Sequence, residues 1–80
     1  MTYKTNGTCS SQIDFDLKEG KVYNVCFTGG CNGNLKGIGL LVEGQDVQKV
    51  IRDLEGITCG EKSTSCPDQL AKALKEALNQ

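Results

Sequence analysis

The first third of the chain alternates apolar and polar positions, which is the pattern of half-buried strands. Between residues 9 and 17, Ile13, Phe15 and Leu17 fall on one face and polar side chains fall on the other. The dipeptide Asn6-Gly7, which is typical of a tight hairpin turn, precedes this run. We therefore expect a short first strand, a turn and a longer second strand.

A second alternating run covers residues 22–28 and places Tyr23, Val25 and Phe27 on one face. A four-residue polar turn, Lys18-Glu19-Gly20-Lys21, separates it from the first run. Together the runs predict a three-stranded antiparallel meander with one apolar side.

The rest of the chain has apolar residues at helical spacing in three segments. Asn32 caps the first segment and Gly44 ends it, whereas Asp46 caps the second and Gly56 ends it. The third runs over about residues 67–78. The sequence therefore predicts a single α+β domain over residues 1–80, with three helices packed on one face of the sheet. We expect one core that includes Ile13, Phe15, Val25, Phe27, Ile38, Val50, Leu54, Leu70 and Leu74.

Two glycines interrupt the first predicted helix. Gly37 and Gly39 each weaken a helix by about 1 kcal/mol relative to alanine. Glycines at such positions are consistent with close packing against a neighbouring element.

Composition excludes several classes of function. The chain has nine basic and ten acidic residues, a net charge of −1 and no histidine. Scattered basic residues predict no nucleic-acid partner, and the lack of histidine excludes Ser-His and Cys-His catalysis. No apolar run reaches the roughly 20 residues of a membrane span, and no segment resembles a signal peptide. We expect a cytosolic protein with no catalytic residues of its own.

Five cysteines in 80 residues are many for a cytosolic chain, and their odd number excludes full disulfide pairing within one chain. Cys26 falls on the strand face opposite Val25 and Phe27. If the preceding strand has no bulge, Cys9 lies on the same face as Ile13. Parity thus separates Cys26 from the other cysteines.

The remaining four cysteines, Cys9, Cys31, Cys59 and Cys66, lie at or near the ends of predicted elements. Such ends can gather at one edge of a small domain, and four thiolates suit tetrahedral zinc or an iron–sulfur cluster. One alternative is a set of unrelated buried thiols, and another is a dithiol redox pair made by Cys59 and Cys66.

The last helix begins in the stretch Thr64-Ser65-Cys66-Pro67-Asp68. Ser65 can cap the helix and Asp68 completes a capping-box pattern, while Pro67 suits the first turn. Cys66 then lies at the positive end of the helix dipole, which favours a thiolate.

These five letters spell the motif that names the TSCPD domain family, and the chain resembles its small standalone members over almost its whole length. Further matching motifs are Gly29-Gly30-Cys31-Asn32-Gly33-Asn34, Leu41-Val42-Glu43-Gly44 and Gly56-Ile57-Thr58-Cys59-Gly60. A related domain occurs at the C-terminus of adenosylcobalamin-dependent ribonucleotide reductases. The resemblance therefore implies a metal-binding or thiol-exchanging module, with a reductase as one possible partner.

A looser similarity of layout is to iron–sulfur cluster assembly scaffolds of the NifU type. Cys9, Cys31 and Cys66 fall at places that match the scaffold cysteines. This chain has Ser11 where the scaffolds have an aspartate and Ser65 where they have a histidine. The similarity implies that Cys59 supplies the fourth ligand and that a cluster-handling protein is a second possible partner.

The sequence thus predicts a small metal-binding module that holds zinc or an iron–sulfur centre on Cys9, Cys31, Cys59 and Cys66. The alternatives are an accessory thiol or metal module for ribonucleotide reduction and a structural domain with reduced buried thiols.

Overall fold

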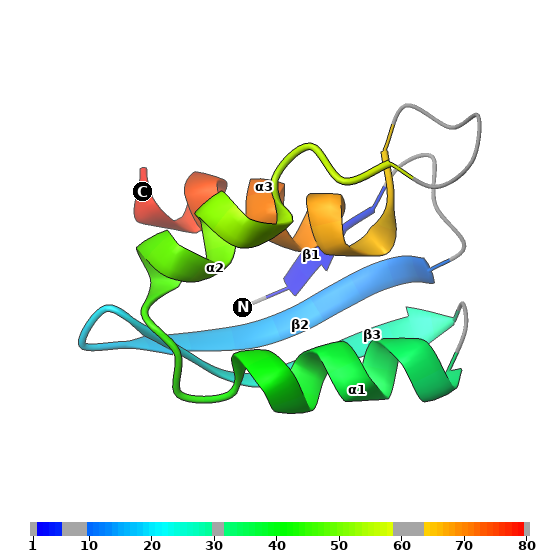
Figure 1. Ribbon diagram of the computed structural model, residues 1–80, viewed down its shortest axis with the longest axis horizontal. Coiled ribbons are helices and arrows are strands. Elements are labelled where there is room, and N and C mark those ends of the chain that lie inside the picture. The colour runs from blue at the N-terminus through cyan, green and yellow to red at the C-terminus, as the bar shows by residue number, and fades with distance from the viewer. Residues whose placement is uncertain (1, 6–9, 30–31, 59–63, 80) are drawn as a thin grey trace.

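The computed structural model describes residues 2–5, 10–29, 32–58 and 64–79, and within these ranges three strands precede three helices (Figure 1). The elements are β1 (Thr2–Lys4), β2 (Ser10–Lys18), β3 (Lys21–Gly29), α1 (Asn32–Val42), α2 (Val47–Leu54) and α3 (Cys66–Leu78).

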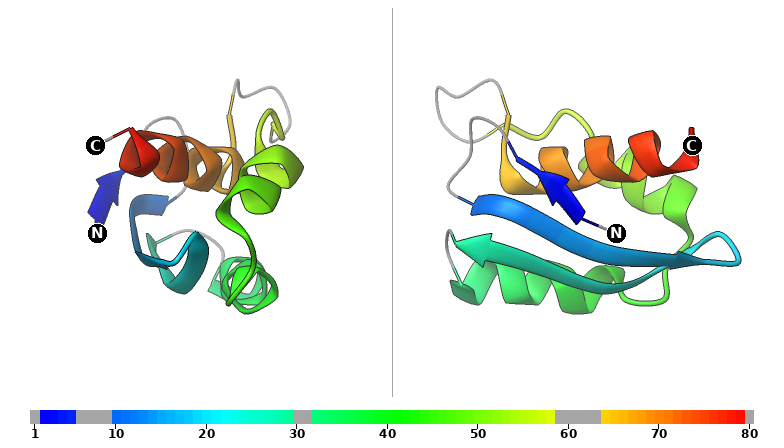
Figure 2. Two further views of the ribbon diagram at one scale, coloured as in Figure 1. Left: turned by 90° about the vertical axis from the view of Figure 1, so that its left-hand side faces the viewer. Right: turned by 180° about the vertical axis from the view of Figure 1, so that it is seen from behind.

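The strands form one antiparallel sheet in the order β1-β2-β3, and the helices lie on one of its faces (Figure 2). α1 packs mainly against β3, whereas α2 and α3 pack against each other over the rest of the sheet. The predicted α+β architecture is therefore confirmed. Among the described residues, no helix is both long and apolar enough to cross a membrane.

The core is one cluster of apolar side chains from β2, β3 and all three helices. Its buried members are Ile13, Phe15, Val22, Val42, Val47, Val50, Ile51, Leu70, Ala73 and Leu74. Four other residues expected in the core, Val25, Phe27, Ile38 and Leu54, are half-buried and pack against this cluster. The predicted core is thus confirmed.

One bulge changes the alternation of β3. Asp14 pairs with Cys26 but Asp16 pairs with Tyr23, so β3 has one extra residue between these pairs. Asn24 lies there with φ of 57°, a left-handed conformation that asparagine tolerates better than most residues. The bulge places Val22 in the core instead of Tyr23. The expectation that Tyr23 shares a face with Val25 is therefore wrong.

A second register shift lies between Ser10 and Gln12 of β2, which pair with Gly29 and Thr28 respectively. The prediction that Cys9 shares a face with Ile13 assumed a strand without a bulge. The register shift removes this assumption, so alternation no longer supports the prediction. Cys9 itself lies outside the described residues.

The outer edge of the first part of β3 is covered by the segment that follows α1. The Val22 amide donates to the Gln45 carbonyl at 3.0 Å, and the Gly44 amide donates to the Val22 carbonyl at 2.7 Å. The Asn24 amide donates to the Glu43 carboxylate at 2.9 Å. These bonds hold the end of α1 against β3.

The two glycines of α1 have different surroundings. A Cβ atom at Gly39 would lie 3.0 Å from the Val25 carbonyl oxygen, whereas one at Gly37 would meet no atom within 4 Å. The close packing expected from the sequence therefore occurs at Gly39 alone.

Candidate functional site

The Thr64–Asp68 motif forms the N-terminus of α3. Ser65 has extended backbone angles (φ −148°, ψ 172°). Its hydroxyl oxygen accepts a hydrogen bond of 3.2 Å from the Asp68 amide. Pro67 lies in the first turn, where a missing amide costs no helical hydrogen bond. The predicted N-cap is confirmed, and it fixes the backbone of Cys66 between a capping residue and a proline.

Asp68 is the most buried charged group described, with 3% of its surface exposed. Its carboxylate accepts hydrogen bonds from the Gly56 amide at 2.8 Å and from the Thr64 hydroxyl, and it pairs with Lys72 at 3.3 Å. Burial raises the pKa of Asp68, but the Thr64, Gly56 and Lys72 interactions outweigh burial and hold it below its ordinary value. The group is thus a fully bonded carboxylate inside the domain.

The remaining polar groups of the motif join the same network. The Ser65 hydroxyl donates to the Ile57 carbonyl at 2.6 Å, and the Gln69 side-chain amide donates to the Thr64 hydroxyl at 2.9 Å. No buried side-chain nitrogen or oxygen in the described ranges lacks a partner. The motif therefore fastens the segment after α2 to the start of α3.

Sequence reasoning found the cap but missed this fastening. Thr64 lies four residues before Asp68 but precedes the cap of α3, so helical spacing does not predict their contact. The contacts with Gly56 and Ile57 span at least eight residues, and no local pattern reports them.

Of the four predicted ligands, Cys66 is described and is partly exposed as the first residue of α3. Cys9, Cys31 and Cys59 lie outside the described residues. Within the described part of the chain, no three cysteine or acidic side chains are grouped as a metal site would need. The four-cysteine assignment accordingly stays a prediction.

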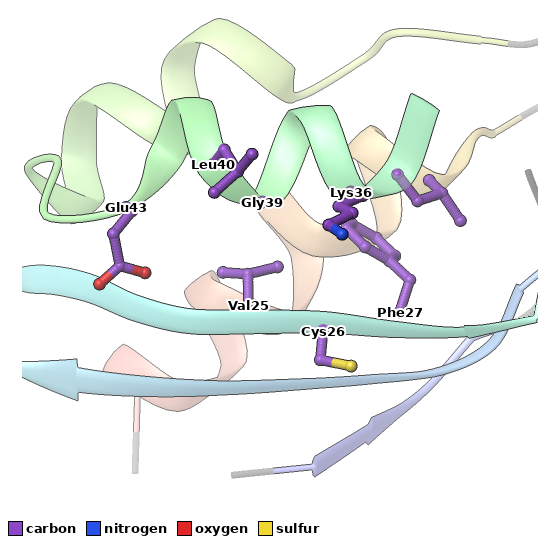
Figure 3. A pocket seen from close by; sticks show the side chains of 8 residues that line it. Val25, Cys26, Phe27, Lys36, Gly39, Leu40 and Glu43 are labelled. Carbon is purple, nitrogen blue, oxygen red and sulfur yellow. The ribbon is translucent and has the colours of Figure 1, made fainter. Parts of the chain in front are cut away.

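Cys26 lies where parity placed it. Its side chain is exposed in the middle of β3 and points away from α1, whereas Val25 and Phe27 point toward α1 (Figure 3). The bulge at Asn24 does not affect this result because it precedes all three residues.

The described ends of several elements gather at one end of the molecule. The start of β2, the end of β3, the start of α1 and the start of α3 all lie there in both Figure 1 and Figure 2. In the sequence, Cys9 directly precedes β2, Cys31 separates β3 from α1, and Cys66 begins α3.

A pocket of about 440 Å³ lies between β3 and α1, on the core side of β3 (Figure 3). Its walls are mostly apolar and include Val25, Phe27 and Leu40, and exposed Lys36 and Glu43 also line it. Cys26 borders the pocket as well, although its side chain points to the other side of the strand.

Comparison with known proteins shows a match to a domain family. No curated protein and no solved structure shows significant similarity to the sequence, and the similarity to NifU-type scaffolds stays a prediction. The model of the TSCPD domain matches residues 1–78. Because this match covers nearly the whole chain and its naming motif forms the buried network at the start of α3, the protein belongs to the TSCPD domain family.

Proposed function

We propose that the protein is a metal-binding module in which Cys9, Cys31, Cys59 and Cys66 hold zinc or an iron–sulfur cluster. The observation that carries the proposal is the gathering of element ends at one end of the domain (Figure 1). Residues adjacent to Cys9 and Cys31 belong to these ends, and Cys66 is itself at one of them.

Cys66 has the most defined surroundings. Its backbone is held by the Ser65 cap and by the bonds of Asp68 to the preceding connection. Cys66 begins α3 and so lies at the positive end of the helix dipole, which favours a negatively charged sulfur ligand. The pre-formed position reduces the cost of ordering this ligand on binding.

The chain just before Cys59 is fastened to the start of α3. Cys59 follows Ile57 by two residues in the sequence, and the Ile57 carbonyl accepts a hydrogen bond from the Ser65 hydroxyl. Two residues of chain reach at most about 7 Å. The bond between Ile57 and Ser65 therefore supports placing Cys59 and Cys66 in one site.

The available donors limit the choice of metal. The chain has no histidine, so the predicted ligands are thiolates, which suit zinc and iron–sulfur centres better than hard cations such as magnesium. Four protein ligands leave no open coordination position, which is the arrangement of a structural site. We infer a role in supporting the fold and its interactions, while the predicted protein partner, a reductase or a cluster-handling protein, stays a prediction.

The test is metal content per chain after anaerobic purification without chelator, together with a visible spectrum. Wild type and Cys26→Ala should carry the same metal, because Cys26 lies in mid-strand on the face away from α1. Cys66→Ala should lose it.

Two results would overturn the assignment. Loss of metal in Cys26→Ala would show that the ligand set is wrong. Wild type that contains no zinc or iron, even when made anaerobically, would favour a domain with reduced thiols.

A further inference from the structure

α1 has an apolar outer face that no described residue covers. Leu40 and Leu41 are 71% and 78% exposed, the highest values among the large hydrophobic side chains described. Gly37 falls between them on the helix surface, and the space around it is open. The opposite side of the helix, with buried Leu35 and Gly39, faces the sheet. Two adjacent exposed leucines beside a glycine are unusual for a helix that faces only water.

Two opposite charges flank this face on one side. Lys36 lies on this side of α1, and Glu43, seven residues later, directly follows the last residue of the helix, about two turns further along the same side. Lys36 forms no ion pair with any other described residue. One oxygen of Glu43 accepts the Asn24 amide, and the carboxylate is otherwise exposed.

We propose that this face binds a second copy of the chain, with the two α1 helices packed antiparallel about a two-fold axis. In an antiparallel pair, the same flank of each helix meets its counterpart in reversed order. Lys36 of each copy then lies beside Glu43 of the other. In a symmetric parallel pair, this flank of one helix would meet the opposite flank of the other, so Lys36 and Glu43 would not face each other. The charge pattern therefore favours the antiparallel arrangement.

The apolar residues require the same register. Suppose that Leu41 of one copy is placed over Gly37 of the other. Lys36 of the first copy is then offset from Glu43 of the second by one residue, or about 1.5 Å along the helix axis. The missing side chain at Gly37 leaves room for the incoming leucine and lets the helices approach closely. Apolar packing and charge pairing are therefore satisfied by one geometry.

The contact is small, because it is centred on one helix of 11 residues. Interfaces of this size give weak association, so we expect a dimer that dissociates on dilution. Neither the metal nor its cysteines take part, and the proposal does not depend on the proposed function.

Sedimentation equilibrium over micromolar to millimolar concentrations tests the proposal. A reductant excludes association through exposed Cys26, and runs with and without chelator separate association through metal from association through α1. Wild type should show a monomer–dimer equilibrium, and Leu41→Glu should remain monomeric. The control is Leu78→Glu, which changes a 42% exposed leucine on α3 and should leave association unchanged. Circular dichroism confirms that each variant is folded.

Charge exchange tests the register. Lys36→Glu and Glu43→Lys should each weaken self-association by about tenfold, because attraction becomes repulsion at two symmetric contacts. An equimolar mixture of the two variants should recover a dimer at least as strong as wild type, since every contact is again between opposite charges. A wild type that is monomeric throughout, a dimeric Leu41→Glu, or a mixture no stronger than its components would overturn the proposal.

Discussion

At the scale of single residues, Asp68 is the side chain that joins two parts of the chain. Its carboxylate accepts hydrogen bonds from the Gly56 amide after α2 and from the Thr64 hydroxyl before α3, and Asp68 and Thr64 are both buried. Removing a buried acceptor leaves its donors without partners, which costs more than the bonds themselves contribute. The carboxylate is therefore a structural group.

Replacing this carboxylate should lower the free energy of unfolding. We expect a loss of about 2–4 kcal/mol for Asp68→Ala, because the Gly56 and Thr64 donors lose their acceptor. Asp68→Asn should lose less, since its side-chain oxygen can still accept the Gly56 amide. The measurement is urea unfolding followed by circular dichroism.

The matched control is Asp53→Ala. Asp53 also pairs with a lysine one turn away, Lys49, but both side chains are about half exposed. Exposed pairs of this kind contribute about 0.5 kcal/mol or less. Equal losses in Asp53→Ala and Asp68→Ala would contradict a special role for the buried carboxylate.

At the scale of elements, α1 shows how contact overrides propensity. Both of its interior glycines cost helix stability, yet only Gly39 lies against another backbone, where a Cβ would be 3.0 Å from the Val25 carbonyl oxygen. That oxygen belongs to a strand and cannot move without disturbing β3. The two positions should therefore respond to the same substitution in opposite directions.

We expect Gly37→Ala to raise the free energy of unfolding by up to about 1 kcal/mol, and Gly39→Ala to lower it by about 1–3 kcal/mol. Each variant is the control for the other, because the gain in helix propensity is the same. Urea unfolding at low micromolar concentration separates this effect from self-association. Similar changes in both variants would show that α1 does not pack closely on β3.

The elements themselves could be predicted because each has a clear period. Alternation gave β2 and β3, and spacing of three and four gave the helices, as the core around Ile13, Val50 and Leu70 confirms. The bulge at Asn24 could not be predicted, because one extra residue leaves no signature in a short alternating run. The extra residue exchanges the two faces of the sheet for the side chains that precede it. Tyr23 was misplaced for that reason, whereas Cys26, after the bulge, was placed correctly.

The candidate site was only partly predictable for a related reason. The cap of α3 is local, so Ser65 and Pro67 could be interpreted from sequence alone. The bonds that join Asp68 to Gly56 and Ser65 to Ile57 depend on how the chain returns after α2. The position of Cys9 could not be derived by parity, because the register shift near Ser10 removes the basis of that argument.

At the scale of the whole molecule, the domain is small enough for a metal to matter to its stability. Eighty residues bury a limited core, and domains of this size are often supported by a metal or a partner. If metal binding and folding are coupled, the loss of one ligand should affect melting as well as metal content.

Thermal melts with and without chelator should show this coupling. Chelator should lower the melting temperature of wild type and of Cys26→Ala by several degrees, since a bound metal stabilises only the folded state. Cys66→Ala should melt lower from the start and should not respond to chelator. An equal response of Cys66→Ala and wild type would contradict the coupling.

The covered edge at the start of β3 has a consequence for self-assembly into fibrils. Backbone groups at the outer edge of a sheet are ready to pair with strands of other molecules, and such pairing starts many aggregates. Here Val22 and Asn24 are already bonded to the segment from Glu43 to Gln45, so their groups cannot pair with another chain. The opposite edge is β1, which has three residues and is too short to template a stable ladder. The start of β3 is therefore protected from pairing with another chain, and copies that meet through the helical side would not extend the sheet.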